Sequence, residues 1–526
     1  MNKFTLVIND IGLDLRRSND MTSSGKVALV GAGPGDEGLL TVRGMELIKQ
    51  ADCIVYDRLL NKRFLELTKD TCEKIYVGKE NHHHTMKQDD INELLFEMAQ
   101  EHELVVRLKG GDPYVFGRGG EEALFLNARG IGVEVVPGVS SAVAAAALSG
   151  IPITHRGLSK GFMVITAHDR KDSISEINYS LLTDEDITLV FLMGLSHVKE
   201  IAENLKNVGR RPDTPAAVIS CGTTTKQKKC IGTLQNIAEL VEKEELISPA
   251  IIVVGEVVSL SEELSFFEKR SLFGKKFFLP EIKKFEYSPD GMRNIRANEL
   301  EKKLTEKGAE VITHVAGRIT PVDIDPGFLK EVDEEDYIVF TSVSGVNTFF
   351  YSLFETCGKD VRALPDCNFA AIGEKTAEAL LRFGIKADVV STKANSKDFA
   401  MQISRLVKEG TKIYWLCGKK HSEDFETQIE PGIELKKIVC YENVPSGTKL
   451  TDEEKKVVAD CDGSIFTCGS NAIFAASQLE KIPGKIYSIG PACSKCLERN
   501  GVTDVIEAEE SSYDGLLEII ERMHFE

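Results

Sequence analysis

The stretch VALVGAGPGDEGLLT, Val27–Thr41, decides the fold of the first half of the chain. Its apolar start predicts a buried strand, and the glycines that follow at alternate positions, Gly31, Gly33 and Gly35, predict a tight turn. Glycine lets the backbone of such a turn approach a ligand closely, although a plain strand-to-helix turn would contain the same residues. A strand, a glycine turn and a helix in this order indicate an α/β domain.

The residues after the turn distinguish between classes of cofactor. A dinucleotide-binding loop has glycine or alanine at the position of Asp36 and binds a diphosphate at the N-terminus of the next helix. Asp36 and Glu37 would repel a diphosphate there, and no Gly-Lys-Ser/Thr follows as in a Walker-type loop. The loop is compatible with an adenosine cofactor that has no phosphates, such as S-adenosylmethionine. An oxidoreductase that uses NAD(P) is the alternative that these carboxylates oppose.

Length, composition and charge restrict the function. The chain has 526 residues, which is enough for three or four domains. Its net charge of −18 argues against general nucleic-acid binding, because a phosphate backbone requires a basic face. No run of about 18 apolar residues occurs, and the N-terminus lacks the features of a signal peptide, so we expect neither a membrane span nor export.

The cysteines predict a reduced, cytoplasmic protein. Twelve cysteines in a chain of this length do not form a disulfide framework. Cys493 and Cys496 are the one close pair, but no second pair follows at zinc-site spacing, and small helix residues fit these positions equally well. We therefore expect no metal site.

Strand-like apolar runs alternate with helical stretches along the whole chain and predict α/β layers. A charged connector near residues 259–276 separates two halves that have different motifs. Within the second half, YIVFTSVSGVNTFF (337–350) resembles GSIFTCGSNAIFAAS (463–477), and the segment from Ala371 resembles the segment from Ser488. This internal repeat predicts two similar α/β domains with a cleft between them.

Later motifs in the first half point to a family. KGGDPYVFGRGGEE (109–122), VPGVSSAVAAAALSGIPITHRG (136–157) and VYDRLL (55–60) closely resemble the uroporphyrinogen-III C-methyltransferases, and FLMG, GTTTKQ and PAIIVVGEVV follow in the order of that family. The resemblance covers about residues 25–260. It implies a two-domain tetrapyrrole-methylase fold, S-adenosylmethionine folded in the cleft between the domains, and a homodimer.

The resemblance also implies the cofactor site. Gly110 and Gly111 would let the backbone reach the adenosine or methionine part, and Asp112 would accept a hydrogen bond from a hydroxyl or ammonium group. Asp112 is otherwise a turn or cap residue before Pro113. Transferred residue by residue, the cofactor-binding positions are Pro34, Gly110, Gly111, Asp112, Val115, Ser140, Ser141, Met193 and Gly222.

In the implied reaction a methyl group passes from a sulfonium to an electron-rich ring carbon, which requires in-line positioning and management of a proton. The resemblance makes Asp57 the candidate proton acceptor and Lys79 the candidate donor; solvated loop charges are the alternative. Arg118 and Arg156 would bind substrate carboxylates or form structural ion pairs. One departure from the family is Glu80 in GKENHHHTMKQ, where the family often has arginine.

The second half resembles uroporphyrinogen-III synthase over about residues 272–526. The motifs FTSVSGVNTFF, AAIGEKTAEALLRFG, SIFTCGSNAIF and IGPACSKCLERNGV carry the resemblance, with KKIVCYENV before the second copy of the repeat and SSYDGLLEII near the end. The fold of that family has two α/β domains joined by extended connections. The motif order implies that one domain uses residues near 275–318 and 442–526, and that the other is inserted as roughly 319–441.

Such a synthase closes the linear hydroxymethylbilane while inverting its last pyrrole ring, and it chiefly folds a substrate that is itself reactive. Tyr441 matches the family tyrosine proposed to assist departure of the hydroxyl; a structural tyrosine is the alternative. The first strand lacks the common Thr-Arg-Pro, and Cys493 replaces a usual threonine. The turn residues that would bind carboxylates, or else cap helices, are Thr341, Ser342, Thr467 and Ser470.

These observations predict an α/β, bifunctional enzyme of tetrapyrrole biosynthesis, with a tetrapyrrole-methylase fold followed by a two-domain synthase-like module. The C-terminal half would make uroporphyrinogen III, and the N-terminal half would methylate it twice to precorrin-2, for siroheme or corrinoids. Hydroxymethylbilane and uroporphyrinogen III are the expected small-molecule partners, and nucleic acid and membrane are not expected. A C-terminal half that senses a tetrapyrrole without cyclising it is the alternative.

Overall fold

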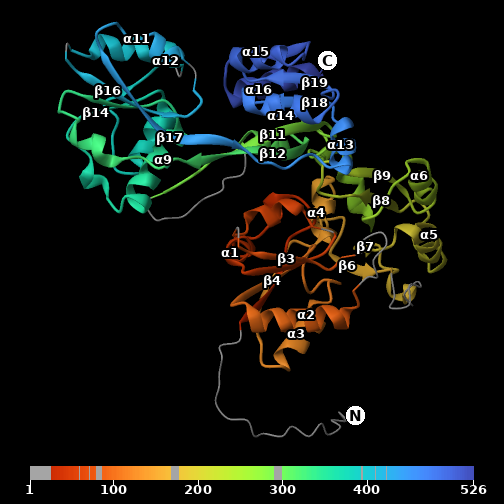
Figure 1. Ribbon diagram of the computed structural model, residues 1–526. Helices are drawn as coiled ribbons and strands as arrows, with labels where there is room; N and C mark the ends of the chain where they lie inside the picture. Colours follow the sequence, from red (N-terminus) through yellow and green to blue (C-terminus); the bar gives the residue numbers. More distant parts are fainter. Residues whose placement is uncertain are drawn as a thin grey trace, which may run out of the picture. The chain divides into compact units, whose positions relative to one another are not determined.

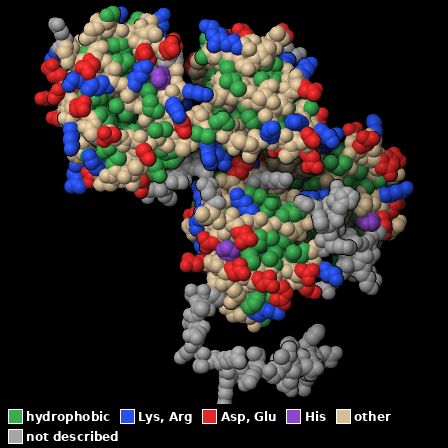
Figure 2. Space-filling model, in the orientation of Figure 1, with side chains coloured by type: hydrophobic (Ala, Val, Ile, Leu, Met, Phe, Trp, Pro, Cys, Tyr) green, Lys and Arg blue, Asp and Glu red, His purple; other side chains and the backbone are tan. Residues whose placement is uncertain are grey.

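The computed structural model describes residues 25–58, 60–69, 71–78, 86–167, 177–288, 299–392, 395–408, 410–421 and 423–525. These residues belong to two compact units, Met1–Phe266 and Phe267–Glu526. On the face that Figure 2 shows, acidic and basic side chains are interspersed over each unit. None of the helices in the described ranges is both long and apolar enough to cross a bilayer.

A parallel sheet with helices on both faces forms the first part of the N-terminal unit (Figure 1). Its strands are β1 (Lys26–Gly31), β2 (Cys53–Tyr56), β3 (Glu73–Tyr76), β4 (Leu104–Lys109) and β5 (Gly132–Val136), and its helices are α1 (Val42–Gln50), α2 (Gln88–Glu101) and α3 (Gly119–Asn127). The strand order is β3-β2-β4-β1-β5. Alternate residues of β1 lie in different cores: Ala28 and Val30 share one with α1, and Val27 and Leu29 share the other with α2 and α3. Burial of both faces explains the continuous apolar run of β1.

The second sheet of the N-terminal unit is mixed. Its strands are β6 (Gly161–Thr166), β7 (Ile187–Leu192), β8 (Pro215–Ser220), β9 (Lys228–Thr233) and β10 (Ala250–Val254), in the order β6-β7-β10-β8-β9. Only the β6–β7 pair is parallel. Helix α4 (Ser141–Leu148) follows β5 and packs its alanines on one face of this sheet, so it joins the two layers. The other face is covered by α5 (Val198–Asn207) and α6 (Ile237–Lys243), and α7 (Ser261–Leu264) follows β10.

The C-terminal unit has a ten-stranded sheet in the order β15-β14-β13-β16-β17-β12-β11-β18-β19-β20. Two 12-residue strands, β12 (Glu310–Pro321) and β17 (Glu434–Pro445), pair antiparallel through Gly317–Pro321 and Tyr441–Pro445, and every other pair in the sheet is parallel. In Figure 1 these two strands run between two α/β lobes. Each lobe therefore has its own parallel strands, and the long pair connects them.

The two lobes repeat the same strand and helix order. In one lobe, β13 (Tyr337–Phe340) leads into α9 (Val343–Tyr351), and β14 (Asn368–Ala371) leads into α10 (Glu374–Leu381). The equivalent elements in the other lobe are β18 (Gly463–Phe466), α14 (Gly469–Gln478), β19 (Lys485–Ser488) and α15 (Pro491–Arg499). The first lobe is completed by β15 (Val389–Val390), α11 (Ser396–Leu406), β16 (Lys412–Gly418) and α12 (Asp424–Thr427), and the second by β11 (Lys276–Lys283), α8 (Glu299–Glu306), α13 (Asp452–Ala459), β20 (Val505–Glu507) and α16 (Tyr513–Phe525).

Candidate active sites

The predicted methyltransferase residues gather at the carboxyl ends of the first sheet. Pro34 follows β1, Asp57 follows β2, Gly110 follows β4, and Ser140 follows β5. Because these strands are parallel, their carboxyl ends share one edge of the sheet, which is the edge where α/β proteins bind ligands. The candidate donor Lys79 lies outside the described residues.

Two glycine loops pair with each other at this edge. The amide of Gly111 donates to the carbonyl of Gly33 at 2.7 Å, and the amide of Gly33 donates back to Gly111 at 3.2 Å. Both glycines have a positive φ, +72° for Gly33 and +66° for Gly111, which residues with side chains rarely adopt. A Cβ on Gly138 would lie 2.1 Å from the Gly111 carbonyl oxygen, so the third loop also approaches closely. The sequence motif is thus explained by backbone contact between loops.

The same edge is open for a ligand beside Gly111. A Cβ added there would meet nothing nearer than the Cα of Ser140 and the amide nitrogen of Ser141, each at 4.0 Å. Ser140 caps α4 through its hydroxyl, which accepts from the amide of Ala142 at 3.3 Å, and Ser141 is the first residue of that helix. Glycine backbone, hydroxyls and a helix N-terminus suit the polar groups of S-adenosylmethionine, so the residues fit this cofactor.

The three carboxylates of the glycine loops all have structural partners. Asp36 accepts from the amide of Gly38 at 2.8 Å and so caps a short 3₁₀ helix, while Glu37 pairs with Arg63 at 3.0 Å. Asp112 accepts from the amides of Tyr114 at 2.7 Å and Gly138 at 3.0 Å. Asp112 therefore has the turn role considered above, and each of its two carboxylate oxygens keeps a second lone pair for a ligand.

Loops of the second sheet reach the first-sheet loops. The amide of Asp36 donates to the hydroxyl of Thr223 at 3.4 Å, and a Cβ on Gly222 would lie 2.5 Å from the Cβ of Ala145. Met193 follows β7 and is 50% exposed, and Val115 is 38% exposed. Several non-glycine residues in these loops have positive φ, which costs roughly 1–2 kcal/mol each and is typical of functional sites; they are Phe116, Arg118, Met193, Cys221 and Thr223.

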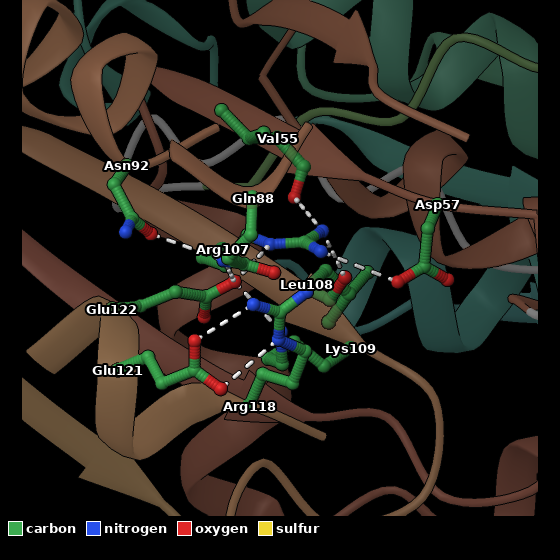
Figure 3. A network of polar contacts seen from close by, with 10 residues as sticks. All are labelled: Val55, Asp57, Gln88, Asn92, Arg107, Leu108, Lys109, Arg118, Glu121 and Glu122. Atoms are coloured by element: carbon green, nitrogen blue, oxygen red, sulfur yellow. Dashed lines mark hydrogen bonds and ion pairs between the residues drawn. The ribbon is translucent and has the colours of Figure 1, made fainter. Parts of the chain in front are cut away.

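Asp57 is attached to a buried polar network that the sequence analysis missed (Figure 3). Its Oδ2 lies 3.3 Å from Nη2 of Arg107, and Nε of Arg107 lies 3.3 Å from Oε1 of Glu122. Lys109 donates to the same oxygen at 2.8 Å. Arg107, Lys109 and Glu122 are all buried, whereas the Asp57 side chain is 29% exposed. The sequence signal was the pair of cations inside the apolar run LVVRLK of β4.

Desolvation controls the electrostatics of Lys109. Burial lowers the pKa of Lys109, the charge of Arg107 lowers it further, and Glu122 acts in the opposite direction.

The two predicted substrate arginines differ from Arg107 and Lys109 because both are exposed. Arg118 pairs with Glu121 at 2.7 Å, a contact that raises its pKa, and Arg156 lies in the turn closed by the bridge between His155 and Ser159.

In the C-terminal unit, Tyr441 and Ser342 meet between β17 and the start of α9. Their hydroxyl oxygens are 3.1 Å apart, and the Ser342 hydroxyl also accepts from the amide of Gly345 at 3.0 Å as the cap of α9. Burial raises the pKa of Tyr441, an effect that the bond to Ser342 partly opposes. Thr341, next to Ser342, accepts from the indole nitrogen of Trp415 at 2.9 Å.

The equivalent turn in the other lobe contains Thr467 and Ser470. Asn471 donates to the hydroxyl of Thr467 at 3.0 Å, and Asn443 of β17 donates to the hydroxyl of Ser470 at 3.0 Å. Ser470 is thus linked to the long strand that also carries Tyr441. Cys493 is buried and lies 3.7 Å from the carbonyl of Phe466, and burial raises its pKa to about 11. Its thiol is therefore protonated at neutral pH.

One cysteine, one histidine and one carboxylate come together elsewhere in the described residues. The ligand atoms of Cys53, Glu73 and His102 lie within 4.8 Å of one another. Burial raises the pKa of the Cys53 thiol to about 12. Nε2 of His102 lies 3.1 Å from Oε2 of Glu73, a hydrogen-bonding contact that accounts for the proximity of these two residues.

Comparisons with known proteins relate both units to families. The family Tetrapyrrole (Corrin/Porphyrin) Methylases matches residues 26–238, and the family Uroporphyrinogen-III synthase HemD matches residues 298–518. The uroporphyrinogen-III C-methyltransferase of Bacillus subtilis (strain 168) is 47% identical over 233 residues, which cover 44% of this chain and 91% of that protein. A solved structure of the Thermus thermophilus uroporphyrin-III C-methyl transferase with S-adenyl homocysteine is 44% identical and covers 45% of this chain and 99% of that one, with a TM-score of 0.39.

A further relative extends across both units. The porphyrin biosynthesis protein HemD of Ruminiclostridium josui is 34% identical over 502 residues, which cover 94% of this chain and 97% of that protein. The chain therefore belongs to a family that joins an S-adenosylmethionine-dependent uroporphyrinogen-III C-methyltransferase to a uroporphyrinogen-III synthase.

Proposed function

We propose that this chain catalyses two consecutive reactions. The module at 272–526 cyclises hydroxymethylbilane to uroporphyrinogen III, and the module at 25–260 methylates that product at C2 and C7 to give precorrin-2. The observation that carries the methyltransferase assignment is the pairing of Gly33 with Gly111 at the same sheet edge as Asp57. The contact between Tyr441 and Ser342 supports the synthase assignment.

S-adenosylmethionine supplies an electrophilic methyl group when it is bound. The chain would hold it by the paired glycine loops, the Ser140–Ser141 turn, and the remaining cofactor candidates Pro34, Gly110, Asp112, Val115, Met193 and Gly222. Formation of the carbon–methyl bond uses an electron pair of the pyrrole, so the tetrapyrrole becomes cationic and releases a proton. Asp57 accepts that proton, and Lys79 is the proposed donor for the protonation that accompanies double-bond rearrangement.

Binding of the anionic tetrapyrrole needs local cations, since the chain as a whole carries a net charge of −18. Arg118 and Arg156 are exposed and close to the methyltransferase loops in sequence, and a guanidinium binds a carboxylate bidentately. Arg118 already pairs with Glu121, so substrate binding would have to replace or share that contact. In the synthase module, Thr341, Ser342, Thr467 and Ser470 would bind carboxylates through hydroxyls and turn amides.

In the synthase reaction, the hydroxyl of the substrate departs, the terminal ring inverts and the macrocycle closes. The partly buried phenol of Tyr441 stays protonated at neutral pH, because desolvation raises its pKa. Tyr441 would therefore donate a hydrogen bond to the departing hydroxyl, with Ser342 orienting the phenol. The product would feed siroheme or corrinoid synthesis, and we propose a cytoplasmic homodimer formed through the methyltransferase module.

A coupled assay tests both assignments on the full chain. Purified protein is incubated with hydroxymethylbilane, with and without S-adenosylmethionine, and oxidised products are separated by chromatography and mass spectrometry. We expect the type-III macrocycle without the cofactor and a doubly methylated product with it. Formation of only the type-I macrocycle would refute the synthase activity, and failure to methylate supplied uroporphyrinogen III would refute the other.

Asp57→Asn tests the proton acceptor separately. The amide keeps the size of the side chain but cannot accept the proton, so we expect kcat for methylation to fall by about 10²-fold or more. Binding of S-adenosylhomocysteine, measured by calorimetry, should stay within about twofold, because Asp57 is not among the proposed cofactor contacts. Full activity of this variant would show that Asp57 has only a structural role, as the ion-pair partner of Arg107.

A further inference from the structure

The buried charges behind Asp57 have no explanation in stability. Ion pairs in a protein interior usually stabilise no more than well-packed apolar residues do, because the charges lose their hydration. Strand β4 nevertheless has two buried cations, Arg107 and Lys109, and α3 contributes Glu122 with 0% exposure. Neighbouring residues of β4, such as Val106 and Leu108, are buried apolar residues. A role for these charges at the sheet edge is therefore the more economical explanation.

Every nitrogen of the Arg107 guanidinium has an acceptor. Nη1 donates to the carbonyls of Val55 and Leu108 at 3.3 and 3.2 Å, Nε lies 3.3 Å from Glu122, and Nη2 lies 3.3 Å from Asp57. The two carbonyls belong to β2, the strand that Asp57 follows, and to β4, the strand that contains Arg107. The guanidinium of Arg107 is thus held by backbone carbonyls of the sheet, and its Nη2 points to the carboxylate of Asp57 (Figure 3).

Glu122 is the acceptor that both cations share. Its Oε1 accepts from Arg107, from Lys109 and from Nε2 of Gln88 at 3.2 Å, and Gln88 is itself bonded to Asn92 at 3.0 Å. Its Oε2 is buried and has no hydrogen-bond partner among the described residues. The contacts of the Glu122 carboxylate with the two cations are therefore made by the shared oxygen Oε1.

We propose that Arg107 is a positioning residue for Asp57, and that Glu122 and Lys109 modify the electrostatic potential at the Asp57 carboxylate. This inference rests on the proposed function of Asp57 as proton acceptor. The cluster contains two cations and two carboxylates, and Asp57 is the member with substantial exposure. Arg107 orients the carboxylate of Asp57, and the positive charge of Arg107 and the negative charge of Glu122 act on that carboxylate in opposite directions.

Charge variants give opposite expected shifts in the pH dependence of methylation. The groups that face Arg107 are Asp57 after β2, Lys109 on β4, Gln88 on α2 and Glu122 on α3. Arg107→Met removes a positive charge, so the acidic limb of kcat/KM should move to higher pH, and kcat should fall about tenfold or more through loss of orientation. Lys109→Met should move the limb in the same direction by less. Glu122→Gln removes a negative charge and should move it to lower pH.

The experiment measures pH–rate profiles of the full chain with uroporphyrinogen III and S-adenosylmethionine. Arg43→Met is the matched control, because it also removes a positive charge: Arg43 lies on α1, forms an exposed pair with Glu134 of β5, and its replacement should leave the limb unchanged. Adding Arg107→Met to Asp57→Asn should cause no further loss of kcat, since Arg107 acts through Asp57. Thermal unfolding identifies any variant that does not fold. Glu122→Gln together with either cation variant decides the sign, and if Glu122→Gln does not fold, the absence of a shift to higher pH in the folded cation variants overturns the proposal.

The outcomes distinguish a failure of the positioning role of Arg107 from a failure of the proposed function of Asp57. Wild-type profiles in all folded charge variants, with Asp57→Asn inactive, would overturn the positioning role and leave the proposed function intact. Shifts of the same sign in Glu122→Gln and Lys109→Met would also overturn it, because a general loss of packing has no charge sign. A fully active Asp57→Asn would instead refute the proposed function of Asp57.

Discussion

The hydroxyl groups of Tyr441 and Ser342 lie 3.1 Å apart at the residue where β17 changes partner. Tyr441 is paired with Gly418 of β16 on one side and with Pro321 of β12 on the other, and the register with β16 shifts at that point. The ring lies against Gly418, where a Cβ would come within 2.7 Å of it. The phenol is therefore fixed at the junction of the two lobes by strand geometry, glycine contact and a serine hydroxyl.

Tyr441→Phe should reduce cyclisation while leaving the fold intact. The variant removes the proposed donor to the departing hydroxyl, and we expect kcat for formation of the type-III macrocycle to fall by about 10²-fold. The ratio of type-III to type-I product, measured by chromatography after oxidation, should fall as well, because spontaneous closure gives the symmetric isomer. Unchanged rate and ratio would make Tyr441 a structural residue.

Tyr414→Phe is the matched control for that variant. Tyr414 is buried in the same lobe, and its hydroxyl donates to the carbonyl of Glu331 at 2.9 Å. Removal of this hydrogen bond should cost about 1 kcal/mol of unfolding free energy without affecting the product ratio. A similar loss of cyclisation in both variants would indicate that the assay reports on stability.

Gly138→Ala should abolish binding of S-adenosylhomocysteine. The new methyl group would lie 2.1 Å from the carbonyl oxygen of Gly111 and would force apart the loops that pair through Gly33 and Gly111. Gly120→Ala is the control in the same region, because a Cβ there meets nothing within 4 Å and Gly120 lies in α3. The control should bind normally and gain roughly 0.5–1 kcal/mol of stability. Calorimetry with the two variants tests this steric explanation.

Backbone periodicity and the internal repeat made much of the fold predictable. The uninterrupted apolar run of β1 indicates burial of both faces, and the paired motifs of the second half indicate two strand–helix repeats. Glycine spacing predicted a tight turn and a close backbone approach to a ligand, and the structure shows in addition that Gly33 pairs with Gly111 of a second loop. The predicted features depend on local residue pattern, which the sequence displays directly. The antiparallel pairing of Gly317–Pro321 with Tyr441–Pro445 joins residues far apart in the chain, and local pattern does not specify it.

The buried network was missed for a different reason. Arg107 and Lys109 appear in the sequence as charges within a strand, a pattern that usually indicates an exposed face. Their burial becomes intelligible only when Glu122 from α3 is placed beside them, a contact set by tertiary packing. The ion pair of Glu37 with Arg63 and the hydrogen bond from Gly138 to Asp112 likewise depend on neighbours that motif matching does not reveal. The turn role of Asp112 is local and was considered from the sequence.

Thr341→Val should change the environment of the single tryptophan. Trp415 is 2% exposed, and its indole nitrogen donates to the hydroxyl of Thr341 at 2.9 Å. Loss of the acceptor leaves a buried donor unsatisfied, which should cost about 1–3 kcal/mol and shift the native emission maximum. Thr467→Val is the equivalent change in the other copy of the repeat, where Thr467 accepts from Asn471 instead. Intrinsic fluorescence should respond to the first variant and remain unchanged in the second.

Cys53 should make the N-terminal unit less stable in alkali. Burial, with a smaller contribution from the charge of Glu73, raises the pKa of Cys53 from 9.0 to about 12. The folded state therefore favours the protonated thiol. The contribution of the protonated Cys53 thiol to the free energy of unfolding is complete below about pH 9. It is lost between about pH 9 and 12, because the unfolded chain releases this proton at lower pH than the folded protein does.

Comparison with Cys53→Val isolates that effect, because valine suits a buried strand position and cannot ionise. The free energy of unfolding of the natural chain should decrease relative to the variant by up to about 1.4 kcal/mol for each pH unit above 9. Other thiols and amines titrate equally in both proteins and cancel in the difference. Denaturant unfolding at pH 8, 9, 10 and 10.5 provides the measurement, and parallel curves would mean that the Cys53 thiol ionises as readily in the folded protein as in the unfolded chain.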